Sequence, residues 1–134
     1  MVKDPKKATT PRPTDAELAI LRVLWDRGPS TVREVHEALR SSQSSGYTSV
    51  LKLLQIMTDK GLVVRDETNR AHVYGPKLSE QRTQLQLLGD LVDRAFAGSS
   101  AKLVLQALSG RRATREELRD IRALLDRLEE RKPQ

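Results

Sequence analysis

Apolar residues recur at steps of three and four along three stretches of the N-terminal half, which predicts three amphipathic helices. The first two stretches begin with capping boxes, a Thr followed three residues later by a Glu, at Thr14–Glu17 and Thr31–Glu34. The third helix is predicted over Tyr47–Lys60, and Gly61 stops it. Its polar connection to the second helix, residues 41–46, is longer than the roughly three or four residues of a tight helix-turn-helix. The positions expected to face the core are Leu18, Leu21, Leu24, Trp25, Val32, Val35, Leu39, Val50, Leu53, Leu54 and Met57.

A strand–turn–strand pattern follows the third helix. Residues Leu62–Arg65 and Ala71–Tyr74 lie on either side of a polar turn, which predicts a short antiparallel pair. Gly75 and Pro76 are expected to end the second strand and to mark the domain boundary. Helices followed by a short β hairpin are the order that a DNA-reading helix with a wing needs. We therefore predict a winged helix-turn-helix domain over residues 14–75.

Three further helical patterns lie in residues 76–134. Ser79 is expected to cap the first, Gly98–Ser100 separates it from the second, and Thr114–Glu117 is a third capping box that opens the last. Because three helices of about fifty residues form only a thin core, their narrow apolar stripes predict association with a second copy of the chain. The fold class is therefore mainly α with a small β wing: a winged helix-turn-helix domain followed by a three-helix dimerisation domain. The residues expected at the dimer interface are Leu85, Leu88, Val92, Phe96, Leu103, Leu118, Ile121, Leu125 and Leu128.

The charge of the chain is positive, with a net value of +6 and an isoelectric point near 10.0. Such an excess favours a polyanionic partner, and the alternative is a charge that serves solubility alone. Residues 1–77 carry 13 Lys and Arg against 9 Asp and Glu, whereas residues 78–134 carry 11 against 9. The excess therefore leans towards the half that contains the predicted third helix.

The outer face of the third helix carries short polar residues that can approach base edges. In direct readout, Lys52 can donate to guanine, Gln55 can pair with adenine, and the methyl group of Thr48 can touch a thymine methyl. The alternative is a plain solvated helix face. The residues predicted to contact bases are Thr48, Ser49, Lys52 and Gln55.

Four further residues are predicted to contact the DNA backbone. Tyr47 can donate its hydroxyl to a phosphate near the start of the third helix, or it can be a half-buried packing ring. Arg65 and Arg70 flank the wing turn and can rest on phosphates or enter the minor groove, or they can form surface pairs with neighbouring carboxylates. Arg33, near the start of the second helix, is the fourth, and an ordinary surface arginine is its alternative.

The composition argues against metal, cofactor and catalytic sites. The chain has no cysteine, which removes disulfides, thiolate metal sites and Cys nucleophiles. Its two histidines, His36 and His72, lie in different predicted elements without an acidic cluster, and His72 is expected to cover the wing. No glycine-rich phosphate loop occurs, and nothing local supports a catalytic triad. We therefore expect no metal, no cofactor and no enzymatic activity.

The expected location is the cytoplasm. No apolar run approaches the roughly 20 residues that span a bilayer, so direct membrane insertion is not expected. The N-terminus also lacks the apolar centre of a signal peptide. Residues 1–13 are rich in Lys, Pro and Thr and are expected to form a flexible arm.

Several strings resemble the BlaI/MecI/CopY family of bacterial transcriptional repressors, also called the penicillinase repressor family. The resemblance covers about residues 14–130, and the N-terminal strings are more specific than the C-terminal ones. The matching strings are Asp15–Leu18, Leu24-Trp25, Gly28–Val35, Tyr47–Val50, Lys60–Leu62, Arg70–Tyr74, Phe96–Ser99 and Glu116–Leu118.

The resemblance implies a winged-helix domain, a helical dimerisation domain, and a homodimer that blocks transcription on a palindromic, inverted-repeat operator. It implies that the helix over Tyr47–Lys60 enters the major groove of double-stranded DNA. Carried over by position, Thr48, Ser49 and Lys52 contact bases and Arg70 lies on the wing.

Two departures from the family pattern affect how repression would be relieved. The copper-responsive branch carries a C-terminal cysteine metal site, which this cysteine-free chain cannot form. The β-lactam branch is switched by a membrane sensor metalloprotease that cuts an Asn–Phe bond, and the matching position here is Gln106-Ala107. We expect relief of repression through damage to the C-terminal helices, with a different cleavage specificity.

The sequence as a whole predicts a DNA-binding repressor. The alternative is a protein-interaction adaptor, because winged helices also serve as docking modules. An adaptor would carry apolar residues on the outer face of the third helix, and this chain carries polar ones.

Overall fold

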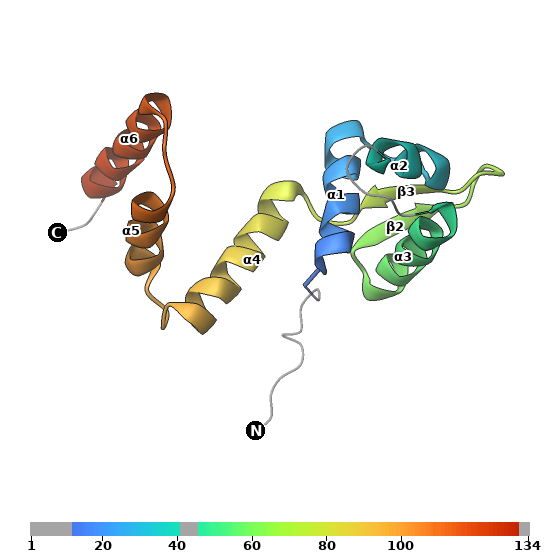
Figure 1. The fold of residues 1–134 in the computed structure, drawn as a ribbon, viewed down its shortest axis with the longest axis horizontal. Coiled ribbons are helices and arrows are strands. Elements are labelled where there is room, and N and C mark those ends of the chain that lie inside the picture. The colour runs from blue at the N-terminus through green and yellow to red at the C-terminus, as the bar shows by residue number, and fades with distance from the viewer. Residues whose placement is uncertain (1–11, 41–45, 132–134) are drawn as a thin grey trace, which may run out of the picture. The chain divides into compact units, whose positions relative to one another are not determined.

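The computed structural model of the 134-residue chain describes residues 12–40 and 46–131 (Figure 1). Most of the arm expected over residues 1–13, and most of the polar connection at residues 41–46, lie outside the described residues. The contacts divide the chain into an N-terminal unit that ends at Leu87 and a C-terminal unit that begins at Leu88. Each unit is described by itself.

The N-terminal unit contains three helices and a three-stranded antiparallel sheet, as a winged helix requires (Figure 1). The strands are arranged in the order β1-β3-β2, and the mainly α fold class with a small β wing is confirmed. The elements are α1 (Asp15–Arg27), β1 (Ser30–Thr31), α2 (Val32–Leu39), α3 (Tyr47–Lys60), β2 (Val63–Asp66) and β3 (Val73–Pro76), followed by the first half of α4 (Glu80–Ala95).

The wing differs in detail from the sequence prediction. Both strands begin and end one or two residues later than expected, because Val63 pairs with Pro76 and the pairing continues through Gly75. Sheet pairing therefore overrides the usual tendency of Gly75-Pro76 to end a strand. The strand β1 was not predicted, because its two residues gain their extended partner, β3, only in the folded chain.

The predicted capping boxes are all present. Glu17 N donates to Thr14 Oγ1 at 3.2 Å, and Thr14 N donates to Glu17 Oε1 at 2.9 Å. The pair Thr31 and Glu34 makes the same two bonds at 3.2 and 2.9 Å. At the other end of α3, Gly61 adopts φ 84°, a left-handed conformation that glycine reaches without steric cost and that reverses the chain towards the wing.

The core of the N-terminal unit is apolar and closed. Leu18, Trp25 and Leu53, which were expected to face inward, are only partly buried, whereas Ile20 and Tyr74 are buried and were not predicted. In α1 the buried stripe runs through Ile20 and Leu24, which leaves Leu18 and Trp25 at its edges. The core consists of Ile20, Leu21, Leu24, Val32, Val35, Leu39, Val50, Leu54, Met57, Leu62, Val63 and Tyr74.

A buried ion pair joins the start of α1 to the end of α3. Lys60 Nζ lies 2.8 Å from Glu17 Oε1 and 3.0 Å from Glu17 Oε2, and Glu17 is only 2% exposed. Burial by itself would raise the pKa of Glu17, but the hydrogen bonds from Lys60 and Thr14 outweigh it and hold the pKa below its ordinary value. Glu17 therefore stays ionised inside the unit.

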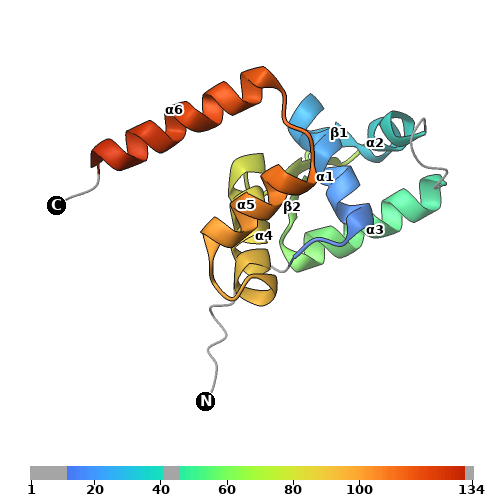
Figure 2. The same cartoon turned by 60° about the vertical axis from the view of Figure 1, so that its left-hand side comes forward.

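The C-terminal unit contains the second half of α4, α5 (Ser100–Gly110) and α6 (Arg115–Arg131). Ser99 caps α5 by accepting from Lys102 N at 3.1 Å. Thr114 and Glu117 form the third capping box, at the end of the extended connection that leads from α5 to α6 (Figure 2).

Most apolar side chains of these three helices are exposed. Val92 is the exception among the expected interface residues, because it is 7% exposed in the single chain, while Phe96, Leu103, Leu118 and Ile121 are half-buried. The exposed apolar residues of α4, α5 and α6 are Leu85, Leu88, Leu91, Val104, Leu105, Leu108, Leu124, Leu125 and Leu128.

Replacement of Glu17 by Gln should lower the free energy of unfolding by about 2–3 kcal/mol. This lies below the roughly 3–5 kcal/mol of a fully buried broken pair, because the side chain of Lys60 is 28% exposed and keeps some water. Glu34→Gln is the matched control, since Gln preserves a capping box and Glu34 is exposed. It should change the free energy by less than about 0.5 kcal/mol. Equal effects in urea unfolding would show that the ion pair with Lys60 does not matter.

The stabilisation by Glu17 should depend on pH. Its folded pKa lies below the ordinary value of 4.5, so the folded chain releases this proton at a lower pH than the unfolded chain does. The difference in unfolding free energy between wild type and Glu17→Gln is therefore expected in full above that ordinary value. It should shrink as the pH falls through the folded pKa. A difference that grows on acidification, measured by urea unfolding at several pH values, would contradict this assignment.

Candidate nucleic-acid interface

The two sides of α3 have opposite character. Val50, Leu54 and Met57 are buried against the core, and Leu53 is partly buried beside them. The opposite side presents exposed polar residues, and no side-chain hydrogen bond engages them within the part of the chain that the structure describes. We call this surface the α3 polar face; it consists of Thr48, Ser49, Lys52 and Gln55.

A hollow of 440 Å³ adjoins the start of α3 and gathers three of the residues predicted to contact phosphates. Arg33 comes from α2, Tyr47 from α3, and Arg70 from the turn between β2 and β3. Residues separated by up to 37 positions in the sequence thus surround one space that offers two guanidinium groups and a phenol. We call it the arginine hollow; it is lined by Thr31, Val32, Arg33, Tyr47, Leu51, Arg70, Ala71, His72 and Tyr74.

Two histidines lie beside the residues predicted to contact phosphates, although the sequence analysis did not place them there. His72, expected only to cover the wing, is exposed and lines the arginine hollow. His36 meets the ring of Tyr47 edge-on, with centroids 6.0 Å apart and planes at 77°. Tyr47 is also 48% exposed, so its ring contacts His36 on one side and solvent on the other. Proximity of His72 to Arg70 in the sequence was the only signal that pointed to it.

Arg65 is paired within the wing. Its Nε lies 2.7 Å from Glu67 Oε2, so the surface pair that was the alternative for this residue is present. A hydrogen bond to Tyr74, followed by the charge of Glu67, raises the pKa of Arg65 further above its ordinary value. Asp66 instead tightens the turn: its Oδ1 accepts from Thr68 N at 2.9 Å and from Thr68 Oγ1 at 2.6 Å. These bonds lower the pKa of Asp66.

The described residues form neither a cluster that could hold a metal ion nor a helix that could span a membrane. Between residues 12 and 40 and between 46 and 131, no three His, Cys, Asp or Glu side chains are grouped so that they could hold a metal ion. Over the same ranges, no helix has the length and apolar character needed to cross a membrane.

Three helices pack with a three-stranded sheet, and the outer face of α3 is exposed to solvent. This arrangement defines a winged-helix protein. The family model for the penicillinase repressor matches residues 13–127. The chain therefore belongs to the penicillinase repressor family, which confirms the resemblance drawn from its sequence.

Two relatives are similar over most of the chain. The transcriptional regulator BlaI of Mycobacterium tuberculosis is 36% identical over 92 residues, which is 68% of this chain and 67% of that protein. The penicillinase repressor of Bacillus licheniformis is 23% identical over 122 residues, which is 91% of this chain and 95% of that protein.

Two solved structures are similar to part of the chain. One is the monomeric form of Bacillus licheniformis BlaI in complex with the blaP half-operator, with 25% identity and a TM-score of 0.48. The match covers 55% of this chain and 89% of that one. The other is the DNA-binding domain of the repressor BlaI, with 25% identity, a TM-score of 0.49, and coverage of 54% and 88%.

Proposed function

We propose that this chain is a cytoplasmic, non-enzymatic transcriptional repressor that binds an inverted-repeat operator in double-stranded DNA as a homodimer. The observation that carries the proposal is the α3 polar face beside the arginine hollow. Membership of the penicillinase repressor family and the regulatory names of both relatives agree with it. This face is largely polar, although Ile56 is 39% exposed on it, and this composition favours DNA over the adaptor alternative.

In this proposal the α3 polar face supplies base recognition. Lys52 lies opposite the buried Leu54, and Gln55 is exposed on the flank of the same face, so both can reach the floor of a major groove. Thr48 and Ser49 lie one turn earlier, in the N-terminal part of the helix that recognition helices present to bases. Short side chains at these two positions allow the helix to approach the groove closely.

The arginine hollow supplies backbone contacts in this proposal. Arg33 and Arg70 can donate to phosphate oxygens, and the hydroxyl of Tyr47 can donate to the same or the next phosphate. The amide groups at the start of α3 favour an anion at this place as well. Arg65 joins these contacts only if a phosphate replaces Glu67 as its partner, which makes its contribution smaller than that of Arg70.

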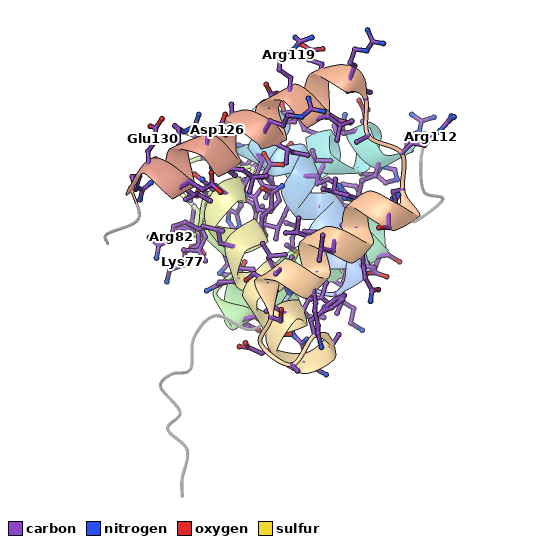
Figure 3. The ribbon with its side chains drawn as sticks, turned by 90° about the vertical axis from the view of Figure 1, so that its left-hand side faces the viewer. Lys77, Arg82, Arg112, Arg119, Asp126 and Glu130 are labelled. Atoms are coloured by element: carbon purple, nitrogen blue, oxygen red, sulfur yellow. The ribbon has the colours of Figure 1, made fainter. Side chains whose placement is uncertain are left out.

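The homodimer is supported by the exposed leucines of the C-terminal helices. On α6, Leu125 and Leu128 are 53% and 47% exposed. The charged residues Arg119, Asp126 and Glu130 extend together from α6 (Figure 3), and helical spacing places them opposite Leu125 and Leu128. A helix with one apolar and one charged side buries the apolar side against another element, and we propose that a second copy of this chain provides that element.

Release from DNA is proposed to follow damage to the C-terminal helices. Gln106 and Ala107 are exposed within α5, in the apolar pattern from Leu103 to Leu108. A cut there would interrupt α5 and disturb the dimer, and the proposed agent is a membrane-bound sensor protease. Because the bond is not Asn–Phe, its specificity would differ from that of the β-lactam branch.

Lys52 and Arg70 should respond differently to replacement by Ala. Lys52→Ala is expected to weaken a selected site by about tenfold or more, with little effect on random DNA, because a base contact is worth roughly 1–3 kcal/mol. Arg70→Ala should weaken both to a similar degree and reduce the slope of log K against log salt by about 0.9. Arg22→Ala, an exposed arginine of α1, is the control. Anisotropy titrations that show wild-type affinity for both variants would refute the assigned interface.

The double variant Leu125→Arg, Leu128→Arg should not form the dimer. Loss of the second half-site contact is expected to weaken operator binding by about 10²–10⁴-fold, whereas binding to a single half-site should not change. Glu130→Lys alters charge on the side of α6 that helical spacing places opposite these leucines, and it should leave the dimer intact. Sedimentation velocity measures the association state, and a persistent dimer of the double variant would place the interface elsewhere.

The proteolytic switch can be tested by intact mass. Co-expression with the cognate sensor protease, followed by induction, should yield two fragments whose masses place the cut within α5. A chain that leaves its operator while uncut and still dimeric would exclude proteolysis and point to a ligand or a modification.

A further inference from the structure

The connection between the wing and α4 is hydrogen-bonded at three successive residues. Lys77 N donates to Leu62 O at 3.0 Å, which extends the β2–β3 pairing beyond Pro76. Trp25 Nε1, from α1, donates to Leu78 O at 3.0 Å. Ser79 Oγ then accepts from Arg82 N at 3.1 Å and caps α4. The chain thus passes from the sheet into α4 without a free linker.

The first turns of α4 belong to the N-terminal unit. Thr83 is only 5% exposed, although it lies in the second turn of a helix that is otherwise largely exposed. Glu80 and Trp25 line the same hollow of 740 Å³, which is bordered by α1 and by the end of α2. The compact unit accordingly extends into α4 as far as Leu87. The direction in which the first turns of α4 leave the sheet is therefore set by contacts within this unit.

Trp25 is the side chain that ties this exit to α1. Its indole is partly buried at the edge of the core, and the bond to Leu78 O spans 53 positions in the sequence. Without the indole N–H, Leu78 O would keep no side-chain donor from α1 among the described residues. Among the described residues, the bond of Lys77 and the burial around Thr83 would then remain to hold the start of α4.

This exit direction matters for a dimer that binds two half-sites. A linked pair of binding modules gains avidity only when the link allows both to engage together. The half-site separation that a dimer accepts is therefore a geometric property of the connection between the modules. From the contacts of Trp25 with Leu78, we infer that Trp25 is a positioning residue that sets the half-site spacing accepted by the homodimer. This inference rests on the proposed DNA-binding function.

The sequence allows a test at one atom. Trp25 is the only tryptophan in the chain, so expression in a tryptophan auxotroph with β-(3-benzothienyl)alanine replaces the indole N–H by sulfur at that position alone. The probes are a duplex selected by the wild-type chain from a random pool, the same duplex with its half-sites moved by one, two and five base pairs (the last about half a helical turn), and a single half-site. Anisotropy titrations give the affinity for each duplex.

The analogue should lose roughly three- to tenfold in affinity at the selected spacing, about the range of one hydrogen bond and the associated avidity. It should lose less than wild type when the half-sites are moved, so that its spacing profile is flatter, and bind the single half-site as wild type does. An unchanged spacing profile would overturn the inference. An equal loss on the single half-site would also overturn it, because the winged helix itself would then be damaged.

Ser30→Ala is the matched control. It removes a side chain–backbone bond of the same unit, from Ser30 Oγ to Gly28 O at 2.8 Å, at a residue that is 2% exposed and pairs with β3. Its spacing profile should equal that of wild type, and a flattened profile in this variant would show that general loosening explains the effect. A wild-type chain that selects no duplex would refute the proposed function itself before any variant is compared.

Discussion

The buried pair between Glu17 and Lys60 is the contact on which the geometry of the winged helix depends. One carboxylate, 2% exposed, accepts from Thr14 N to begin α1 and from Lys60 Nζ at the end of α3. Gly61 reverses the chain immediately afterwards, so the same pair also fixes where the wing begins. A carboxylate in such a place is tolerated only with its partner, because an unpaired buried charge costs several kcal/mol. The orientation of α3, and with it that of the α3 polar face, is thereby tied to the first helix.

The two units differ in how they satisfy their apolar residues. The N-terminal unit buries its apolar residues around Ile20, Leu54 and Tyr74 and is complete as a single chain. The C-terminal unit leaves leucines such as Leu125 and Leu128 about half exposed. This contrast fits a protein in which one half recognises DNA and the other supplies association. Within the N-terminal unit, the bond from Trp25 to Leu78 O holds the start of α4 to α1, and in the proposed function this contact bears on both tasks.

Four basic residues of the N-terminal unit form two groups that differ in their surroundings. Lys60 and Arg65 are already paired with Glu17 and Glu67, so their charges stabilise the unit itself. Arg33 and Arg70 line a hollow together with two tyrosines and a histidine, and no carboxylate is among the described residues that line it. The positive net charge alone does not make this distinction. In the proposed function, only the second group is immediately available to a phosphate.

The sequence by itself determined the features that depend on near neighbours. The three capping boxes, the bounds of α3 and the polar character of its outer face follow from residues three or four positions apart, and all were predicted. The resemblance to the penicillinase repressor family likewise came from short strings of neighbouring residues, mainly in the N-terminal half. The assigned DNA contacts and dimer residues stay predictions.

Only the tertiary structure decided the features that join distant parts of the chain. The pairing of β1 with β3, the bond of Trp25 to Leu78 across 53 positions, and the pair of Lys60 with Glu17 across 43 positions were not predicted. The sequence marked Lys60 as a helix end and Trp25 as a core residue, but helical periodicity cannot say which distant group a side chain meets. Such partners are set by how the helices and the sheet pack together, and that packing exists only in the folded chain.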